Sequence, residues 1–235
     1  MTLSGSALFV SMLTVASGDI DEGRKIFHDP SLGRNGVACT SCHSAVKDED
    51  KEGDGLLRPG HTLFGVARRK YWRVDFKRRA HAELSKAVDV CVQLFQGGEP
   101  LQGDRRASLD AFLRSISPAG GHPVIEIRAT LEADLDYDRP KYRDGDADRG
   151  KRLFYQACHG CHPHGASGLG STLFKKKWTD VARKLREGNG LLRGARKAGE
   201  WMPFFGTDRL SDREVAAIAA FVELLEPPQA RGPTP

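Results

Sequence analysis

The residues with the clearest chemistry in this chain are two clusters of Cys and His. Residues 39–43 read Cys-Thr-Ser-Cys-His, and residues 158–162 read Cys-His-Gly-Cys-His. In a Cys-x-x-Cys-His motif two thiols can add to the vinyl groups of one porphyrin, while the adjacent His reaches its iron. The sequence therefore predicts two covalently attached c-type haems, held by Cys39, Cys42 and His43 and by Cys158, Cys161 and His162.

Other interpretations of the two clusters fit less well. Two Cys pairs that share one zinc ion are normally separated by roughly 15–20 residues, whereas these lie in opposite halves of the chain. A thioredoxin-like redox pair does not explain a His after the second Cys in both copies. Five Cys in 235 residues are too few for a disulfide scaffold. Because haem attachment of this kind takes place after export, we expect a periplasmic protein.

The segments around the clusters also repeat, which indicates the elements that position them. Residues 19–27 match residues 146–154, and each segment has an Asp suited to cap a helix, then a Gly and an apolar-aromatic pair. Residues 108–118 resemble residues 218–227, with a Phe in the same register and a Pro after the helix. The later helix begins with a capping box, Ser211 and Glu214. These patterns predict a mainly α-helical chain with two tandem domains.

Composition divides the chain further. We predict a signal peptide or N-terminal helix at 1–18, a first domain at 19–120, a linker with a short strand at 121–145, a second domain at 146–228 and a disordered tail at 229–235. The first segment is uncharged and too short an apolar run to cross a bilayer, and we expect no transmembrane segment elsewhere. The tail is rich in Pro.

Charge gives a weaker indication of partners. The chain has 36 Lys and Arg against 31 Asp and Glu, a formal net charge of +5. A small excess of this kind favours encounters with acidic partners, and because basic and acidic clusters alternate it does not indicate a nucleic-acid surface. The hydrophobic share of 39% is ordinary for a soluble protein with a packed core.

On these motifs each half resembles a small monohaem cytochrome c domain, and the chain resembles a dihaem c-type cytochrome. The resemblance implies that the N-terminal helix of each half is crossed by its C-terminal helix. It also implies that Gly23 and Gly150 lie at these crossings and that Phe112 and Phe221 are their aromatic partners. A distal iron ligand is expected between the motif and the last helix.

The distal ligand of the second haem is expected to be Met202. Residues 200–205 read Glu-Trp-Met-Pro-Phe-Phe and precede the last helix by the interval that the resemblance implies. The chain has only three Met, and the other two lie near the N-terminus. Because a thioether ligand favours ferrous iron, the second haem should have the higher reduction potential.

The first half has no Met in the corresponding place, and the remaining Cys falls close to it. When the last helices are aligned on Phe112 and Phe221, Cys91 lies almost at the position of Met202. This stretch is similar to the Cys-ligated haem domains of thiosulfate dehydrogenases and of the haem subunit of the Sox complex. His81 and His61 are rival ligands, an open site is a further alternative, and a buried inert thiol is the ordinary role of such a Cys.

Two functions follow from these ligands. The first is a periplasmic dihaem cytochrome that passes single electrons between redox partner proteins, the first haem having the lower potential. The alternative is an oxidoreductase similar to thiosulfate dehydrogenase, which would oxidise thiosulfate or a related sulfur anion at a labile Cys91 ligand. Basic residues would attract such an anion. The sequence leaves open whether the protein is an enzyme.

Overall fold

A computed structural model describes residues 18–47, 53–73, 80–120, 139–188 and 202–228. The predicted N-terminal segment (except Gly18), the strand expected within 124–131 and the C-terminal tail beyond 228 lie outside the described residues. Within the described ranges, none of the helices combines the length and apolar character that crossing a bilayer requires.

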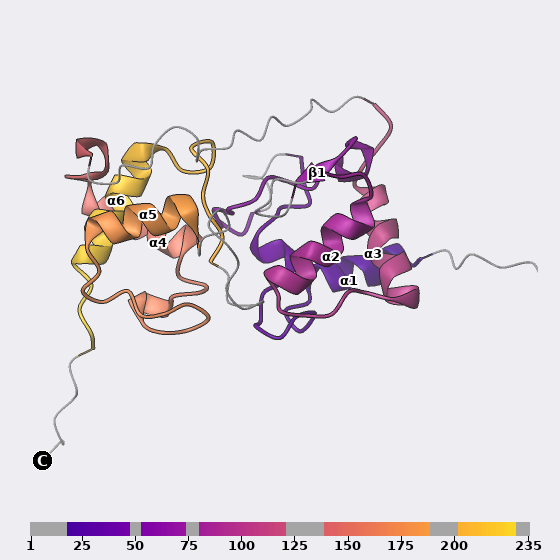
Figure 1. Ribbon diagram of the computed structural model, residues 1–235, viewed down its shortest axis with the longest axis horizontal. Helices are drawn as coiled ribbons and strands as arrows, with labels where there is room; N and C mark the ends of the chain where they lie inside the picture. Colours follow the sequence, from indigo (N-terminus) through magenta and orange to yellow (C-terminus); the bar gives the residue numbers. More distant parts are fainter. Residues whose placement is uncertain (1–17, 48–52, 74–79, 121–138, 189–201, 229–235) are drawn as a thin grey trace, which may run out of the picture.

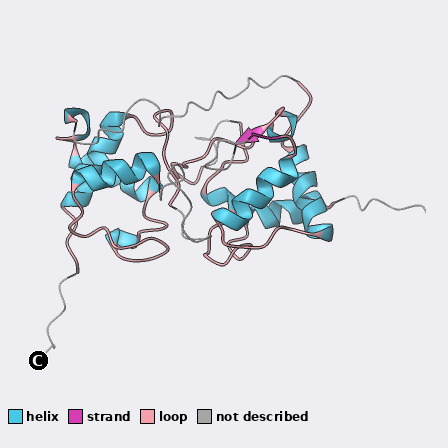
Figure 2. Ribbon diagram, in the orientation of Figure 1, coloured by secondary structure: helices cyan, strands magenta, loops and turns pink. Residues whose placement is uncertain are grey.

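The described residues are mainly helical, as predicted (Figures 1 and 2). The helices are α1 (Ile20–His28), α2 (Leu84–Leu94), α3 (Gly103–Ser115), α4 (Ala147–Ala157), α5 (Trp178–Glu187) and α6 (Asp212–Glu223). Single turns of 3-10 helix are formed by Cys39–Ser41, Val66–Arg68, Pro140–Tyr142 and Pro163–Gly165. Two short antiparallel strands, β1 (Trp72–Arg73) and β2 (Ala80–His81), pair Trp72 with His81.

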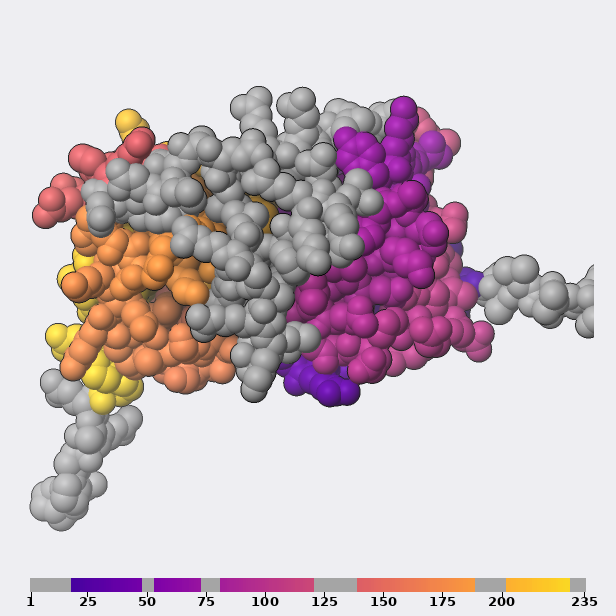
Figure 3. Space-filling model, in the orientation of Figure 1, coloured from indigo at the N-terminus to yellow at the C-terminus, as the bar shows by residue number. Residues whose placement is uncertain are grey.

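The helices pack around two separate cores. The first lies where α1 meets α3 and includes Phe27, Leu109 and Phe112, and the second lies among α4, α5 and α6 and includes Phe154 and Leu185. The two sets of helices stand at opposite ends of the ribbon in Figure 1, and the colours of the two halves of the sequence lie at opposite ends of the surface in Figure 3. Each half of the sequence thus supplies one hydrophobic core of its own.

The two helix crossings have the same construction. A Cβ atom on Gly23 would lie 2.0 Å from the carbonyl oxygen of Ser108, and one on Gly150 would lie 1.9 Å from that of Ala217. Beside the crossings, the ring centroids of Phe27 and Phe112 are 5.4 Å apart, and those of Phe154 and Phe221 are 5.3 Å apart. The predicted roles of Gly23, Gly150 and the paired Phe side chains are confirmed. Only a residue without a side chain lets the helices approach this closely.

Gly150→Ala is therefore expected to lower the free energy of unfolding of the second half by about 2–4 kcal/mol, because α4 and α6 would have to separate. Urea unfolding followed by circular dichroism measures this loss. Lys151→Ala is the control on the same helix, since the side chain of Lys151 is exposed on α4. Equal stability of the two variants would contradict the argument.

Helix starts follow the local sequence. The carboxylate of Asp19 accepts hydrogen bonds from the backbone N–H groups of Asp21 and Glu22. The carboxylate of Asp146 does the same for Asp148 and Arg149 at the start of α4. The capping box of Ser211 and Glu214 at the start of α6 is present. These caps need only neighbouring residues, which is why the sequence predicts them well.

The C-terminal part of the predicted linker is packed against the second core. Tyr142 is buried among the residues of that core, and the turn Pro140–Tyr142 contacts α6. Lys141 pairs with Asp212 at the start of α6, at 3.0 Å. The second half therefore includes residues that composition alone assigns to the linker.

Candidate haem sites

The two motif histidines are held in the same way. His43 Nδ1 lies 2.7 Å from the carbonyl oxygen of His61, and His162 Nδ1 lies 2.8 Å from that of Ser171. A carbonyl oxygen can only accept, so each Nδ1 must carry a proton. In the neutral imidazole this leaves Nε2 as the ring nitrogen that could bind a metal, and the protein fixes the tautomer.

A glycine packs against each of these rings. A Cβ atom on Gly60 would lie 2.3 Å from Cε1 of His43, and one on Gly170 would lie 2.1 Å from Cε1 of His162. The N–H of Gly60 donates to the carbonyl of Cys42, and the N–H of Gly170 donates to that of Cys161. The loop after each motif therefore returns against the motif and fixes the ring.

These loops contain a repeat that the sequence analysis missed. Residues 60–64 read Gly-His-Thr-Leu-Phe, and residues 170–174 read Gly-Ser-Thr-Leu-Phe. Four of the five positions are identical, and this self-similarity was available in the sequence. In this register His61 corresponds to Ser171. The carbonyl of each of these two residues accepts the hydrogen bond from the motif histidine of its own half.

The electrostatic surroundings also suit iron ligation. Burial lowers the pKa of His162, and the hydrogen bond to Ser171 opposes this only in part. The imidazole is therefore neutral at pH 7, the form that binds a metal. The Cys and His donors, the Nδ1 tautomer and the close-packed rings fit a covalently attached haem at each motif.

All five Cys are thiols without disulfides. Burial raises the pKa of Cys42 to about 12, with further contributions from the nearby thiols of Cys161 and Cys39. Burial likewise raises the pKa of Cys158 to about 12. Cys161 belongs to the second motif and Cys42 to the first, so the thiol of one half adds to the pKa rise in the other.

The fifth cysteine faces the first motif. Cys91 lies on α2, and its thiol is near enough to Cys39 and Cys42 for both to raise its pKa. Burial is the main cause of this rise, which brings the pKa to about 12. The thiol is protonated at pH 7 when no metal is present, and coordination to iron would displace that proton.

Helix α2 is fixed to α3 by one arginine. Arg106 on α3 donates to the carbonyl of Ser85 at 3.1 Å and to that of Leu101 at 3.2 Å. It also forms an ion pair with Asp89, which lies two residues before Cys91. At the end of α2, the buried side chain of Gln96 places Nε2 3.7 Å from Sγ of Cys39. These contacts fix the helix that carries Cys91 beside the first motif.

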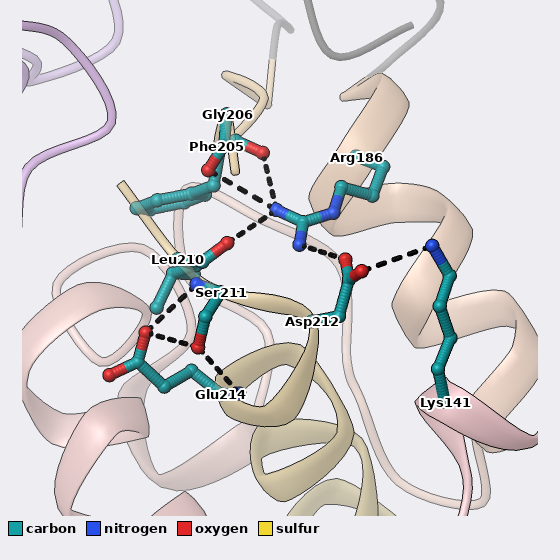
Figure 4. A network of polar contacts seen from close by, with 8 residues as sticks. All are labelled: Lys141, Arg186, Phe205, Gly206, Leu210, Ser211, Asp212 and Glu214. Atoms are coloured by element: carbon teal, nitrogen blue, oxygen red, sulfur yellow. Dashed lines mark hydrogen bonds and ion pairs between the residues drawn. The ribbon is translucent and has the colours of Figure 1, made fainter. Parts of the chain in front are cut away.

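Met202 is the first described residue after 189–201 in the connection between α5 and α6, and it packs against the second core, which includes Cys158. Figure 4 shows how Arg186 holds this loop. Its guanidinium donates to three backbone carbonyls and to one carboxylate, those of Phe205 at 3.0 Å, Gly206 at 3.2 Å, Leu210 at 2.8 Å and Asp212 at 2.7 Å. The side chain of Arg186 is only 4% exposed. A charged group at this depth needs hydrogen-bond partners, and those of Arg186 are all made by its two terminal nitrogens, while Nε is buried without a partner. These bonds fix residues 205–212, which follow Met202.

The two rival histidines lie next to elements of the first site. The carbonyl of His61 accepts from Nδ1 of His43, while Nε2 of His61 lies 2.6 Å from Oδ2 of Asp208 in the second half. His81 lies in β2, which pairs with β1 and packs against α2.

Comparison with known proteins supports this site chemistry for the second half. Residues 145–222 match the family described as cytochrome c oxidase, cbb3-type, subunit III. No curated protein matches the chain. The matched span contains α4, the second Cys-x-x-Cys-His motif, Met202 and most of α6. This similarity supports a c-type cytochrome with covalently attached haem, for which electron transfer is the expected role.

Proposed function

We propose that this protein is a periplasmic dihaem cytochrome c that accepts single electrons from one redox partner and delivers them to another. The observation that carries the proposal is the duplicated geometry around the motif histidines. In both halves Nδ1 donates to the second residue of a Gly-x-Thr-Leu-Phe loop, and the Gly packs on the ring. A site built twice in this way is suited to hold two haems.

A bound c-type haem supplies a one-electron couple at each motif, and the protein's residues set how it is used. His43 and His162 are held as proximal ligands by the carbonyls of His61 and Ser171. Met202 and Cys91 are the proposed distal ligands. A thioether raises the potential and a thiolate lowers it, so the first haem would be the lower-potential centre.

The position of Cys91 supports ligation and does not by itself indicate a substrate. Cys91 faces Cys39 and Cys42 from α2, and Arg106 and Gln96 fix that helix. Arg68 and Arg69 donate hydrogen bonds to the carbonyls of Ser117 and Thr62. The duplicated site carries the electron-carrier proposal, and thiosulfate turnover would be needed to favour the sulfur-anion oxidase.

Spectroscopy of the oxidised, exported protein tests this proposal. We expect two haems by mass spectrometry, two distinct potentials in a redox titration, and a low-spin thiolate signal in electron paramagnetic resonance. In Cys91→Ala the thiolate signal should disappear and the lower potential should rise, because the negatively charged ligand that stabilises ferric iron is lost. The higher potential should stay unchanged.

Val88→Ala is the matched control, since it shortens another partly buried side chain of α2 without removing sulfur. One haem per chain, or two equal potentials, would contradict the proposal. A bis-histidine signal would exclude Cys91 as the distal ligand of the first haem and would assign that role to His81. Thiosulfate turnover that is abolished in Cys91→Ala would replace the carrier with an enzyme.

A further inference from the structure

The two halves of the chain are joined by hydrogen bonds between residues that also serve the haem sites. On the first side the contact is made by residues 57–61, and on the second side by Gln156, Asp208 and Arg209. The N–H of Leu57 donates to the carbonyl of Gln156 at 3.0 Å. Arg209 Nε donates to the carbonyl of Arg58 at 2.9 Å.

The first-side segment is the one that supports the first motif. Arg58 is buried, and its Nε donates at 2.7 Å to the carbonyl of Thr40, which lies between the motif cysteines. Two residues later the N–H of Gly60 donates to the carbonyl of Cys42. The carbonyl of His61 then accepts a hydrogen bond from Nδ1 of His43. A displacement of residues 57–61 would therefore change the orientation of the His43 ring, the proposed proximal ligand.

The second-side residues belong to the loop that carries Met202. Asp208 and Arg209 lie between Gly206 and Leu210, whose carbonyls both accept from Arg186. The guanidinium of Arg186 therefore holds the backbone on either side of Asp208. The carboxylate of Asp208 is held in turn at 2.6 Å from Nε2 of His61, with side chains 31% and 19% exposed.

We propose that Asp208 is a positioning residue for the haem of the other half. The carboxylate of Asp208 fixes the ring of His61, and the carbonyl of His61 orients His43. This arrangement lowers the reduction potential of the first haem. This rests on the proposed two-haem function. The contact between His61 and Asp208 then couples the two sites. Through it, the loop that contains Met202 affects the hydrogen bond that orients His43.

Two physical effects act in the same direction. A carboxylate near the first site stabilises the oxidised state, which carries one more positive charge than the reduced state. A well-aligned hydrogen bond from Nδ1 of His43 to the carbonyl makes the imidazole a stronger electron donor, which also favours ferric iron. Loss of the carboxylate removes the first effect and weakens the second.

Asp208→Asn in the full-length holoprotein tests this inference by redox titration of both haems. We expect the potential of the first haem to rise and that of the second to stay constant. The distribution of one electron between the haems should shift about threefold to tenfold toward the first, tenfold being 59 mV for a one-electron couple. Asp208→Glu, which keeps the carboxylate, should restore most of the difference.

The control for net charge is Asp180→Asn. Asp180 pairs with Arg183 on α5, and both side chains are about half exposed. It should leave both potentials unchanged. His61→Gln should reproduce the shift of Asp208→Asn, and the double variant should shift no further, because both changes remove the same contact.

Unchanged potentials in a two-haem Asp208→Asn protein would overturn this inference alone. A shift of only the second haem would overturn it as well, since Asp208 would then act through the Met202 loop. A protein that carries haem at the second motif only would overturn the proposed function and this inference with it.

Discussion

Met202→Ala is expected to lower the reduction potential of the second haem by on the order of 0.1–0.3 V, within the roughly 0.8 V span that axial ligands cover. The physical reason is the loss of a thioether, which stabilises ferrous iron. The charge-transfer absorption of Met-ligated ferric haem should disappear in the same variant. Redox titration and visible spectroscopy of the holoprotein measure both effects.

Leu225→Ala is the matched control, because Leu225 also packs against the second core without supplying sulfur. Its second-haem potential should stay close to that of the unmodified protein. If Met202→Ala kept both the potential and the absorption band, another residue would have to be the distal ligand. The potential of the first haem should not change in either variant.

Arg186→Met is expected to lower the free energy of unfolding of the second half by about 2–4 kcal/mol. The substitution leaves the carbonyls of Phe205, Gly206 and Leu210 without their donor. It also removes one partner of the ion pair with Asp212, although Asp212 is 32% exposed and keeps Lys141, which moderates the loss. The loop should loosen, so that Met ligation weakens together with stability.

Two further variants separate the contributions. Arg186→Lys keeps the charge but cannot reproduce the planar set of donors, so it should give an intermediate loss. Lys141→Met removes the more exposed ion pair and the contact of the ammonium group with the Tyr142 ring, and it should cost about 1 kcal/mol. Denaturant unfolding of the three variants measures this order. Equal stability of Arg186→Met and Lys141→Met would contradict the role assigned to Arg186.

The same network gives the second half an acid dependence. Burial opposes ionisation of Asp212, but hydrogen bonds from Arg186 and Lys141 outweigh it, and the pKa of this carboxyl lies below its usual 3.8. Because the folded-state pKa is the lower one, the carboxylate adds stability above pH 3.8 and loses it as the pH falls through the folded value. In Arg186→Met this acid-dependent part should shrink.

Much of the fold could be predicted because its signals are local. The Asp19 and Asp146 caps, the Ser211 capping box and the Gly and Phe positions of the crossings depend on spacing within one helix or on its repeat. The boundaries of the linker were harder to predict. Its composition is that of an exposed segment, yet Tyr142 packs into the second core. A single aromatic residue in a charged stretch gives no periodic pattern to detect.

The candidate sites divide in the same way. The sequence by itself determined the two Cys-x-x-Cys-His motifs, since the chemistry of attachment requires residues that are adjacent in the chain. It also singled out Cys91 and Met202, whose ligand roles stay predictions. The proximal role of the His61 carbonyl was missed, although the repeat of residues 60–64 at 170–174 was open to inspection.

Only the tertiary structure decided what surrounds these ligands. It placed Cys91 near Cys39 and Cys42, Arg186 in hydrogen-bonding contact with the loop that contains Met202, and Asp208 in contact with His61. These pairs are distant in sequence, and a lone Arg, Asp or Cys carries no periodic signal of its partner. Such contacts arise from how helices pack and loops close, so they become visible only when the whole chain is folded.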